Sequence, residues 1–228
     1  MELIEIMEEL KGLGNERTKK QYLHYGARED LLYGVSIKDM KPIAKGINHN
    51  NEMAMALFDT GNYDAMYLAG MIVNPKEMTK EIFNHWMSKA YFYMIGDYIV
   101  SVSLAETGFA LELAAEWMES DEELKQSAGW STYTWVLGVR KDSEIDKNEI
   151  AHRLHKAKTE IGAALDRTKH AMDLFIAAVG ISYRPLHEEA LEAAAFICEV
   201  YPEASAEKSI KKAVAQNRIG FKRKNVRC

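Results

Sequence analysis

The chain has 228 residues, of which 47% are apolar and 28% charged, with 14 glycines and 4 prolines. These values exclude collagen-like, intrinsically disordered and disulfide-scaffold proteins, and they indicate one soluble globular unit or two small ones. No stretch reaches the roughly 18 to 20 uncharged apolar residues that a membrane helix requires, and residues 1–5 are acidic where a secretory leader is basic. We therefore expect a cytoplasmic protein with no membrane partner.

The formal net charge of −5 combines an acidic body with a basic end. Residues 208–228 contain eight Lys or Arg and no Asp or Glu, whereas the rest of the chain contains 21 basic and 34 acidic residues. The net charge therefore does not exclude a polyanionic partner. Cys198 and Cys228 are thirty residues apart, which is a poor basis for a disulfide framework, and we expect both to be free thiols.

Helical hydrophobic periodicity dominates the chain, and no convincing run alternates apolar and polar residues over the length of a strand. Apolar residues at helical spacing predict a first helix over residues 3–13, followed by a loop around 26–36 and a helix over 37–46 capped by Ser36. The other expected helices span 51–59, 63–73, 75–90, 91–106 with a break or bend near Gly96, 108–119, 121–139, 147–158, 165–179, 186–201 and 204–217.

Several of these helices are the second members of pairs and share a composition, a polar start followed by small and apolar residues, as in 64–70, 126–132 and 169–178. Helical hairpins that recur every ~30 to 50 residues are typical of HEAT or armadillo-type solenoids. The same periodicity permits an irregular helical bundle. We expect an all-α fold with a single domain over 1–228, in which 218–228 is a basic C-terminal tail.

The C-terminal tail groups Lys222, Arg223, Lys224 and Arg227 close to the aromatic residue Phe221. This composition suits phosphate contacts through charge, with a stacking contact from the ring. The alternative is a solvated tail without a ligand.

Two further features suggest a site within the helices. Aromatic residues gather at 91–98, 117 and 130–135, where they either stack on an extruded base or pack in the core. Asp97 follows Gly96 within an apolar, aromatic run, so its carboxylate is either functional or a helix cap.

Other catalytic and metal motifs find no support. His152 and His155 share a helix face but lack a third ligand, and we find no Gly-rich phosphate loop, G-x-S-x-G or H-E-x-x-H. We expect no metal and no cofactor.

Five segments, in their order and spacing, carry a resemblance to a known family. They are Tyr33-Gly-Val-Ser-Ile-Lys-Asp-Met-Lys, residues 111–120 with Trp117, Ala128-Gly129-Trp130, residues 171–180, and the terminal Arg218-Ile-Gly-x-Lys-Arg-Lys-x-x-x-Cys. Together they resemble the DNA alkylation repair enzyme family of AlkD-like HEAT-repeat proteins, in a branch that ends in Gly-x-Lys-Arg-Lys-x-x-x-Cys.

The resemblance implies a right-handed superhelix of antiparallel HEAT-like hairpins that binds duplex DNA, damaged in some members, in a concave basic groove. Active members excise N3- or N7-alkylated purines with a Trp-x-x-x-Asp pair, an Arg and a second Trp. By segment order these four positions carry Gly96, Val100, Ser127 and Ile181 in this chain. A shift of one helical turn pairs Tyr93 with Asp97 at the same spacing, and Arg184 lies a turn beyond Ile181.

The resulting hypothesis is a DNA-binding protein of the alkylation-repair type, and glycosylase activity depends on whether the substituted site works. The alternative is a non-catalytic HEAT-like scaffold for protein–protein interaction. We assign Asp97 as the candidate catalytic residue and Tyr93, Trp130 and Tyr133 as candidate base or sugar contacts. The candidate DNA-backbone contacts are Arg140, Lys141, Lys169, Arg184, Lys222, Arg223, Lys224 and Arg227.

Overall fold

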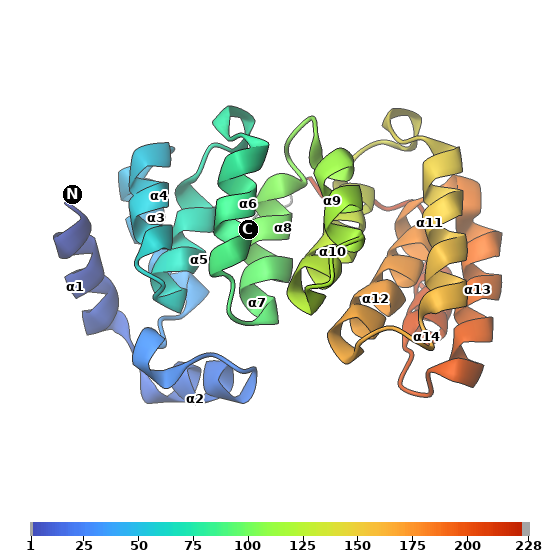
Figure 1. Ribbon diagram of the computed structural model, residues 1–228, viewed down its shortest axis with the longest axis horizontal. Coiled ribbons are helices and arrows are strands. Elements are labelled where there is room, and N and C mark those ends of the chain that lie inside the picture. Colours follow the sequence, from blue (N-terminus) through green and yellow to red (C-terminus); the bar gives the residue numbers. More distant parts are fainter. Residues whose placement is uncertain (1, 225–228) are drawn as a thin grey trace. The chain divides into compact units, whose positions relative to one another are not determined.

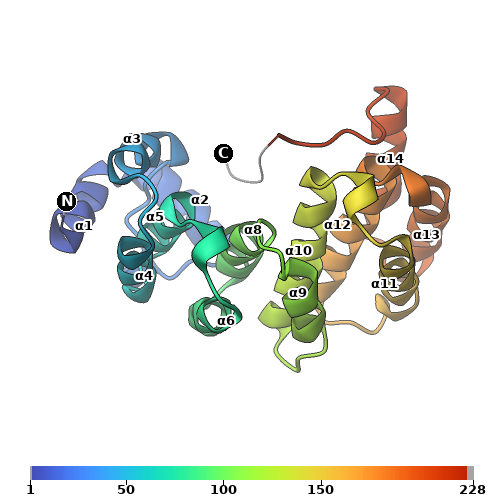
Figure 2. The ribbon, with the colours of Figure 1, turned by 90° about the horizontal axis from the view of Figure 1, so that it is seen from above.

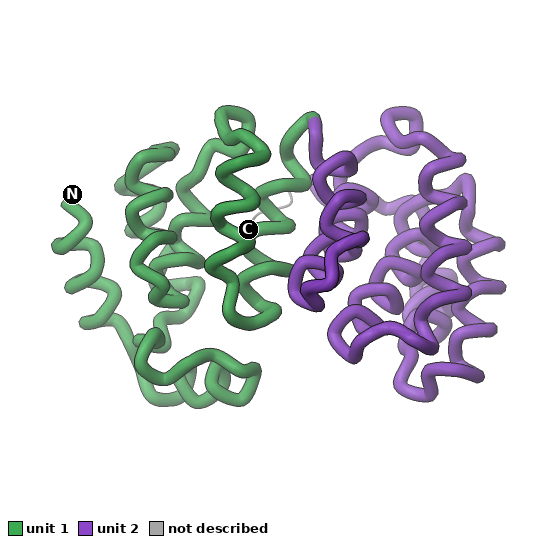
Figure 3. Tube along the Cα trace, in the orientation of Figure 1, with its two compact units in different colours: residues 1–108, 227–228 green, residues 109–226 purple. Residues whose placement is uncertain are grey.

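The computed structural model describes residues 2–224, and every regular element within them is helical, as the sequence predicts (Figure 1). The chain divides into two compact units, the first ending at residue 108 and the second beginning at residue 109 (Figure 3). Repeat arrays are built so that each repeat contacts only its neighbours, and such a division is compatible with the single repeat domain that we expect. None of the helices in the described residues is long and apolar enough to cross a membrane.

The first unit contains eight α-helices and one π-helical segment among its described residues. They are α1 (Leu3–Leu13), α2 (Glu16–His24), α3 (Ile37–Ile47), α4 (Asn51–Asp59), α5 (Tyr63–Ile72), α6 (Lys80–Lys89), α7 (Tyr93–Ile95), the π-helix Gly96–Val100 and α8 (Ser101–Leu104). The expected break near Gly96 is confirmed, because the helical hydrogen-bond pattern changes from α to π at that glycine.

Two expectations for the first unit need correction. Pro75 does not open a long helix: Pro75–Glu77 is a single 3₁₀ turn, and α6 begins at Lys80 with the Thr79 side chain accepting from the Ile82 amide. The helix α2 was not among the expected elements. Ser36, in contrast, caps α3 as predicted and accepts from the Asp39 amide at 3.2 Å.

The second unit consists of six α-helices in its described residues. They are α9 (Ala110–Met118), α10 (Glu123–Val139), α11 (Lys147–Glu160), α12 (Asp166–Ser182), α13 (His187–Val200) and α14 (Ala206–Ala215). The 17-residue helices α10 and α12 lie against each other, and α9 covers α10 while α13 and α14 cover α12. They therefore form the centre of this unit.

Small residues allow this close packing. At Gly129 a Cβ atom would lie 2.7 Å from the Ala114 carbonyl oxygen of α9, so a larger residue would force α9 and α10 apart. Trp130 and Phe175 meet between α10 and α12, with ring centroids 5.2 Å apart. The small and apolar residues from which we predicted stacked hairpins therefore lie at the contacts between helices.

Buried aspartates fasten loops to the second helix of a pair in each unit. Asp64 of α5 accepts from the amides of Tyr33, Gly34 and Val35 at 2.6–3.0 Å, and Asp173 of α12 accepts from the Ser205 hydroxyl and from the amides of Ser205 and Ala206. These bonds satisfy backbone groups that have no helical partner, at the loop before α3 and at the start of α14.

Candidate nucleic-acid interface

The first part of the basic tail, residues 218–224, is folded back onto the second unit. The chain that leaves α14 runs past the C-terminal ends of α12 and α10 (Figure 2). The Gly220 amide donates to the Ile181 carbonyl of α12 at 2.7 Å, and the Arg223 amide donates to the Gly138 carbonyl of α10 at 2.7 Å. Because both acceptors belong to the last turns of their helices, the tail satisfies carbonyls that the helices leave unpaired.

Gly220 allows the chain to pass at this point. Its φ of +78° lies in the left-handed region, and a Cβ atom here would collide with the Arg184 side chain. The tail can therefore lie directly over Arg184, two residues beyond the end of α12.

Lys222 fixes the tail to α10. Its ammonium group donates to the Leu137 carbonyl at 2.9 Å and forms an ion pair with Asp142 at 2.8 Å. The position of a cation at a helix C-terminus is favourable because the helix dipole is negative there. Asp142 also accepts from the Arg184 amide at 3.3 Å, so one carboxylate joins the ends of α10 and α12 to the tail.

Five of the predicted DNA-backbone residues gather around this junction. We call them the basic end: Arg140, Lys141, Arg184, Arg223 and Lys224. All are exposed except Arg140, which is partly buried, and burial lowers the pKa of its guanidinium. Glu144 lies in the same turn and accepts from the Lys141 amide at 3.2 Å.

Of the other three predicted backbone contacts, the structure describes Lys222 and Lys169, and both lie in other surroundings. The Lys222 charge is occupied by Asp142, so this residue holds the tail in place. Lys169 lies 3.8 Å from Asp166 in the first turn of α12, roughly 20 Å along the helix from Arg184. Arg227, together with Cys228, lies outside the described residues.

The candidate catalytic and base-contact residues are mostly buried. Asp97 is 2% exposed within the π-helix of the first unit, where Tyr93 packs edge-on against Tyr98. In the second unit Trp130 is 1% exposed and Tyr133 is fully buried, and both rings contact Phe175. Burial of this degree favours the packing interpretation for Trp130 and Tyr133.

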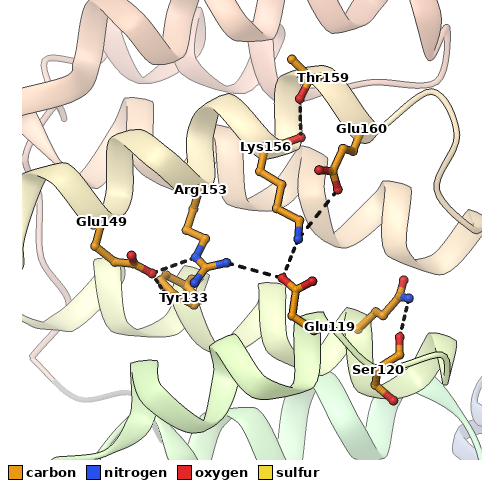
Figure 4. Close-up of polar contacts among 9 residues, drawn as sticks. Glu119, Ser120, Tyr133, Glu149, Arg153, Lys156, Thr159 and Glu160 are labelled. Carbon is orange, nitrogen blue, oxygen red and sulfur yellow. Dashed lines mark hydrogen bonds and ion pairs between the residues drawn. The ribbon is translucent and has the colours of Figure 1, made fainter.

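Tyr133 belongs to a chain of charged groups that joins α9, α10 and α11 (Figure 4). Its hydroxyl donates to Glu149 at 2.5 Å, Arg153 donates to the same carboxylate at 2.8 Å, and Lys156 contacts Glu119 at 2.5 Å. Burial alone would raise the pKa of Glu149, but the hydrogen bonds from Tyr133 and Arg153 hold it below its usual value. Arg153 and Lys156 therefore have carboxylate partners within the fold.

A cavity of about 470 Å³ opens near this chain of charged groups, at the opposite end of α10 and α12 from the basic end. Glu119, Asp121 and Glu160 line it with a single cation, Lys156, so its wall suits a DNA backbone poorly. Within residues 2–224 no group of three or more His, Cys, Asp or Glu is placed to hold a metal ion.

The cations of the basic end are among the residues that the sequence suggested, but the residue that joins them to the tail is not. Asp142 could not be recognised from the sequence, because charged residues are common in the loops that follow helices. Trp135 belongs to the aromatic cluster that the sequence indicates, but its contact with the tail was not expected: the Arg223 guanidinium lies 5.3 Å from its ring centroid, which adds a cation–π contact between the tail and α10.

Comparison with known proteins gives three relevant matches. Two proteins, from Listeria monocytogenes and Listeria innocua and both described as uncharacterized, are each 30% identical over 198 residues, which is 85% of this chain and of theirs. A solved structure is 47% identical and covers the whole of both chains with a TM-score of 0.94. It is described as belonging to a new family of proteins related to the HEAT-like repeat DNA glycosylases with affinity for branched DNA structures.

The HEAT-like architecture predicted from the sequence is confirmed by this structural match. The family model of the DNA alkylation repair enzymes matches residues 6–216, which is most of the chain. This protein therefore belongs to the DNA alkylation repair enzyme family.

Proposed function

We propose that this protein binds DNA through the basic end of the second unit, that it prefers branched DNA to a linear duplex, and that it does not excise bases. The observation that carries the proposal is the folded-back tail, in which the Arg223 backbone is bonded to α10 two residues before Arg140 and Gly220 lies against the Arg184 side chain. The affinity for branched DNA described for the structurally similar protein supports the choice of ligand.

The physical basis of the proposal is charge density. Lys and Arg side chains bind phosphates and release the counterions condensed on the DNA, and this term is independent of sequence. Backbones of several arms converge at a branch, so a compact group of cations meets more phosphates there than along one duplex. The acidic body of the chain confines favourable contact with DNA to regions such as the basic end.

The test compares a three-way junction with a linear duplex of the same length and composition in a fluorescence anisotropy titration over a salt series. We expect tighter binding to the junction, with a log–log salt slope of about −0.9 for each phosphate neutralised. A flat salt response, or no binding at low ionic strength, contradicts the proposal and favours the protein-scaffold alternative.

A matched pair of variants assigns the binding to the basic end. The double substitution Arg223→Ala with Lys224→Ala is expected to reduce both the affinity and the salt slope. The double substitution Lys208→Ala with Lys212→Ala makes the same change in net charge on exposed residues at α14. Equal losses in the two variants would show that net charge alone, and not the basic end, determines the affinity.

A further inference from the structure

Phe221 is an exposed aromatic residue within a stretch of backbone that is fixed on both sides. The Gly220 amide is bonded to α12 and the Arg223 amide to α10, and the Phe221 amide itself donates to the Arg218 carbonyl at 3.2 Å. The side chain is nevertheless 55% exposed. The backbone is therefore held in position while the ring remains open to solvent.

One cation contacts this ring, and a second lies close to the neighbouring backbone. The Arg218 guanidinium lies 5.3 Å from the ring centroid, and the Arg184 side chain lies beside Gly220. An exposed phenyl ring gains nothing from water, and burying it would be favourable. Its position among cations is that of an aromatic contact in a surface that binds single-stranded or unpaired nucleic acid.

We propose that the Phe221 ring stacks on a base that is exposed at a DNA branch point, and that this contact determines the preference for branched over linear DNA. The inference rests on the proposed function, and it names the residue that provides specificity at the same site.

The reason for this specificity lies in which base faces are free. Inside a linear duplex both faces of every base pair are covered by neighbouring pairs, so a ring on the protein surface can stack only after the bases have been separated. At a branch the continuous stack is interrupted, and terminal pairs or unpaired bases offer a free face. Cations alone bind phosphates in both kinds of DNA, whereas the ring gains a partner only at the branch.

The experiment measures the ratio of junction to duplex affinity in the full-length chain. Phe221→Ala is expected to lower this ratio by roughly 5- to 100-fold, the range given by alanine substitution of an aromatic residue that stacks on one base. Phe221→Trp is expected to keep the ratio high, since the indole also stacks.

A matched control is available in Phe196. Its ring is 42% exposed on α13, and the Lys158 ammonium lies 4.9 Å from its centroid, but it is not part of the basic end. Phe196→Ala is expected to leave the ratio unchanged. An unchanged ratio in Phe221→Ala, or an equal fall in both variants, overturns the inference.

A second measurement reports stacking directly. A junction with 2-aminopurine at the branch point is expected to change fluorescence when the wild-type chain binds and to show a smaller change with Phe221→Ala. Thermal melting is expected to be similar for both chains because the ring is exposed. If the wild type binds junctions and both chains give equal fluorescence changes, the role of Phe221 is rejected but the proposed function stands. If the wild type binds no DNA, the proposed function is rejected as well.

Discussion

At the scale of single residues, Asp142 provides the ion pair among the contacts that hold the tail against the second unit. Its carboxylate contacts Lys222 of the tail and the Arg184 amide after α12, and its own position follows the end of α10. Both partners of the ion pair are partly buried, with side chains 20% and 28% exposed. We therefore expect this acidic residue to favour DNA binding, because it holds the tail at the basic end.

Substituting Asp142→Asn separates this positional role from simple electrostatics. Removal of a negative charge strengthens DNA binding if charge alone matters. We expect affinity to fall instead, by about 2- to 5-fold, because the tail loses an ion-pair anchor. Anisotropy titration measures the effect, and Asp166→Asn, at an exposed position in the first turn of α12, serves as control. Tighter binding by Asp142→Asn than by the wild type would refute the positional role.

The sequence identified several residues of the basic end, since Arg140, Lys141, Arg184, Arg223 and Lys224 follow directly from their charge and grouping. From sequence, Lys222 has the same expected role. In the structure its side chain pairs with Asp142, and this ion pair could not be foreseen because it depends on the packing of α10, α12 and the tail. Packing likewise determines that Trp130 is covered by neighbouring helices.

At the scale of the elements, the charged chain between α9, α10 and α11 is expected to contribute stability that depends on pH. The pKa of Glu149 is lowered in the folded state, so its contribution is present above the unfolded pKa and is lost as the pH falls through the folded value.

Glu149→Gln tests this expectation. At pH 7 the substitution is expected to destabilise the protein by about 1 kcal/mol, because a charge-assisted hydrogen bond to a partly buried group is weakened. Below the usual Glu value of 4.5 the difference from the wild type is expected to shrink, since the wild-type carboxyl becomes neutral. Thermal melting across this pH range measures it, and Glu192→Gln at an exposed position of α13, outside the charged chain, is the control. A difference that stays constant with pH would contradict the assignment.

Hydrophobic periodicity predicted most elements because most helices bury a stripe of apolar residues. α1 and α4 have the predicted bounds. The signal failed for α2, in which Tyr22 is the buried residue and most others are polar. It also failed at Pro75, since a proline suits the first turn of an α-helix and a 3₁₀ turn equally well.

At the scale of the whole molecule, membership of a repair-enzyme family does not by itself imply base excision. Hydrolysis of an alkylpurine needs a group that stabilises the oxocarbenium-like sugar and positions a water. By segment order the corresponding positions hold Gly96, Val100, Ser127 and Ile181, and their side chains offer no carboxylate, guanidinium or indole. Asp97, the nearest carboxylate in sequence, is 2% exposed.

We therefore expect no release of free 3-methyladenine, 7-methyladenine or 7-methylguanine from methylated DNA above the rate without protein. Chromatography of the released bases measures this under conditions in which DNA binding has been demonstrated. Asp97→Asn is the informative comparison: release by the wild type that this variant abolishes would establish a glycosylase that uses Asp97 and would refute the proposed lack of excision.

The architecture and family of the whole chain could be predicted because they depend on many weak features spread over its length, such as segment order and paired helices. The candidate site depends on a few contacts between segments that are distant in the sequence. No repeated sequence feature indicates such contacts. The path of the tail across two helix ends is the clearest example.

The presence of a glycine at the position of Gly220 can be used to recognise homologous chains whose tails follow the same path. Lysine and arginine at the end of a sequence do not indicate whether that end packs against the fold, since they also occur in solvent-exposed terminal segments. A residue with a β-carbon in place of Gly220 would be strained at its φ and would collide with Arg184. Homologues that carry the basic run without this glycine are therefore expected to present their cations on a freely moving terminus, and to discriminate less between the shapes of nucleic acid that they meet.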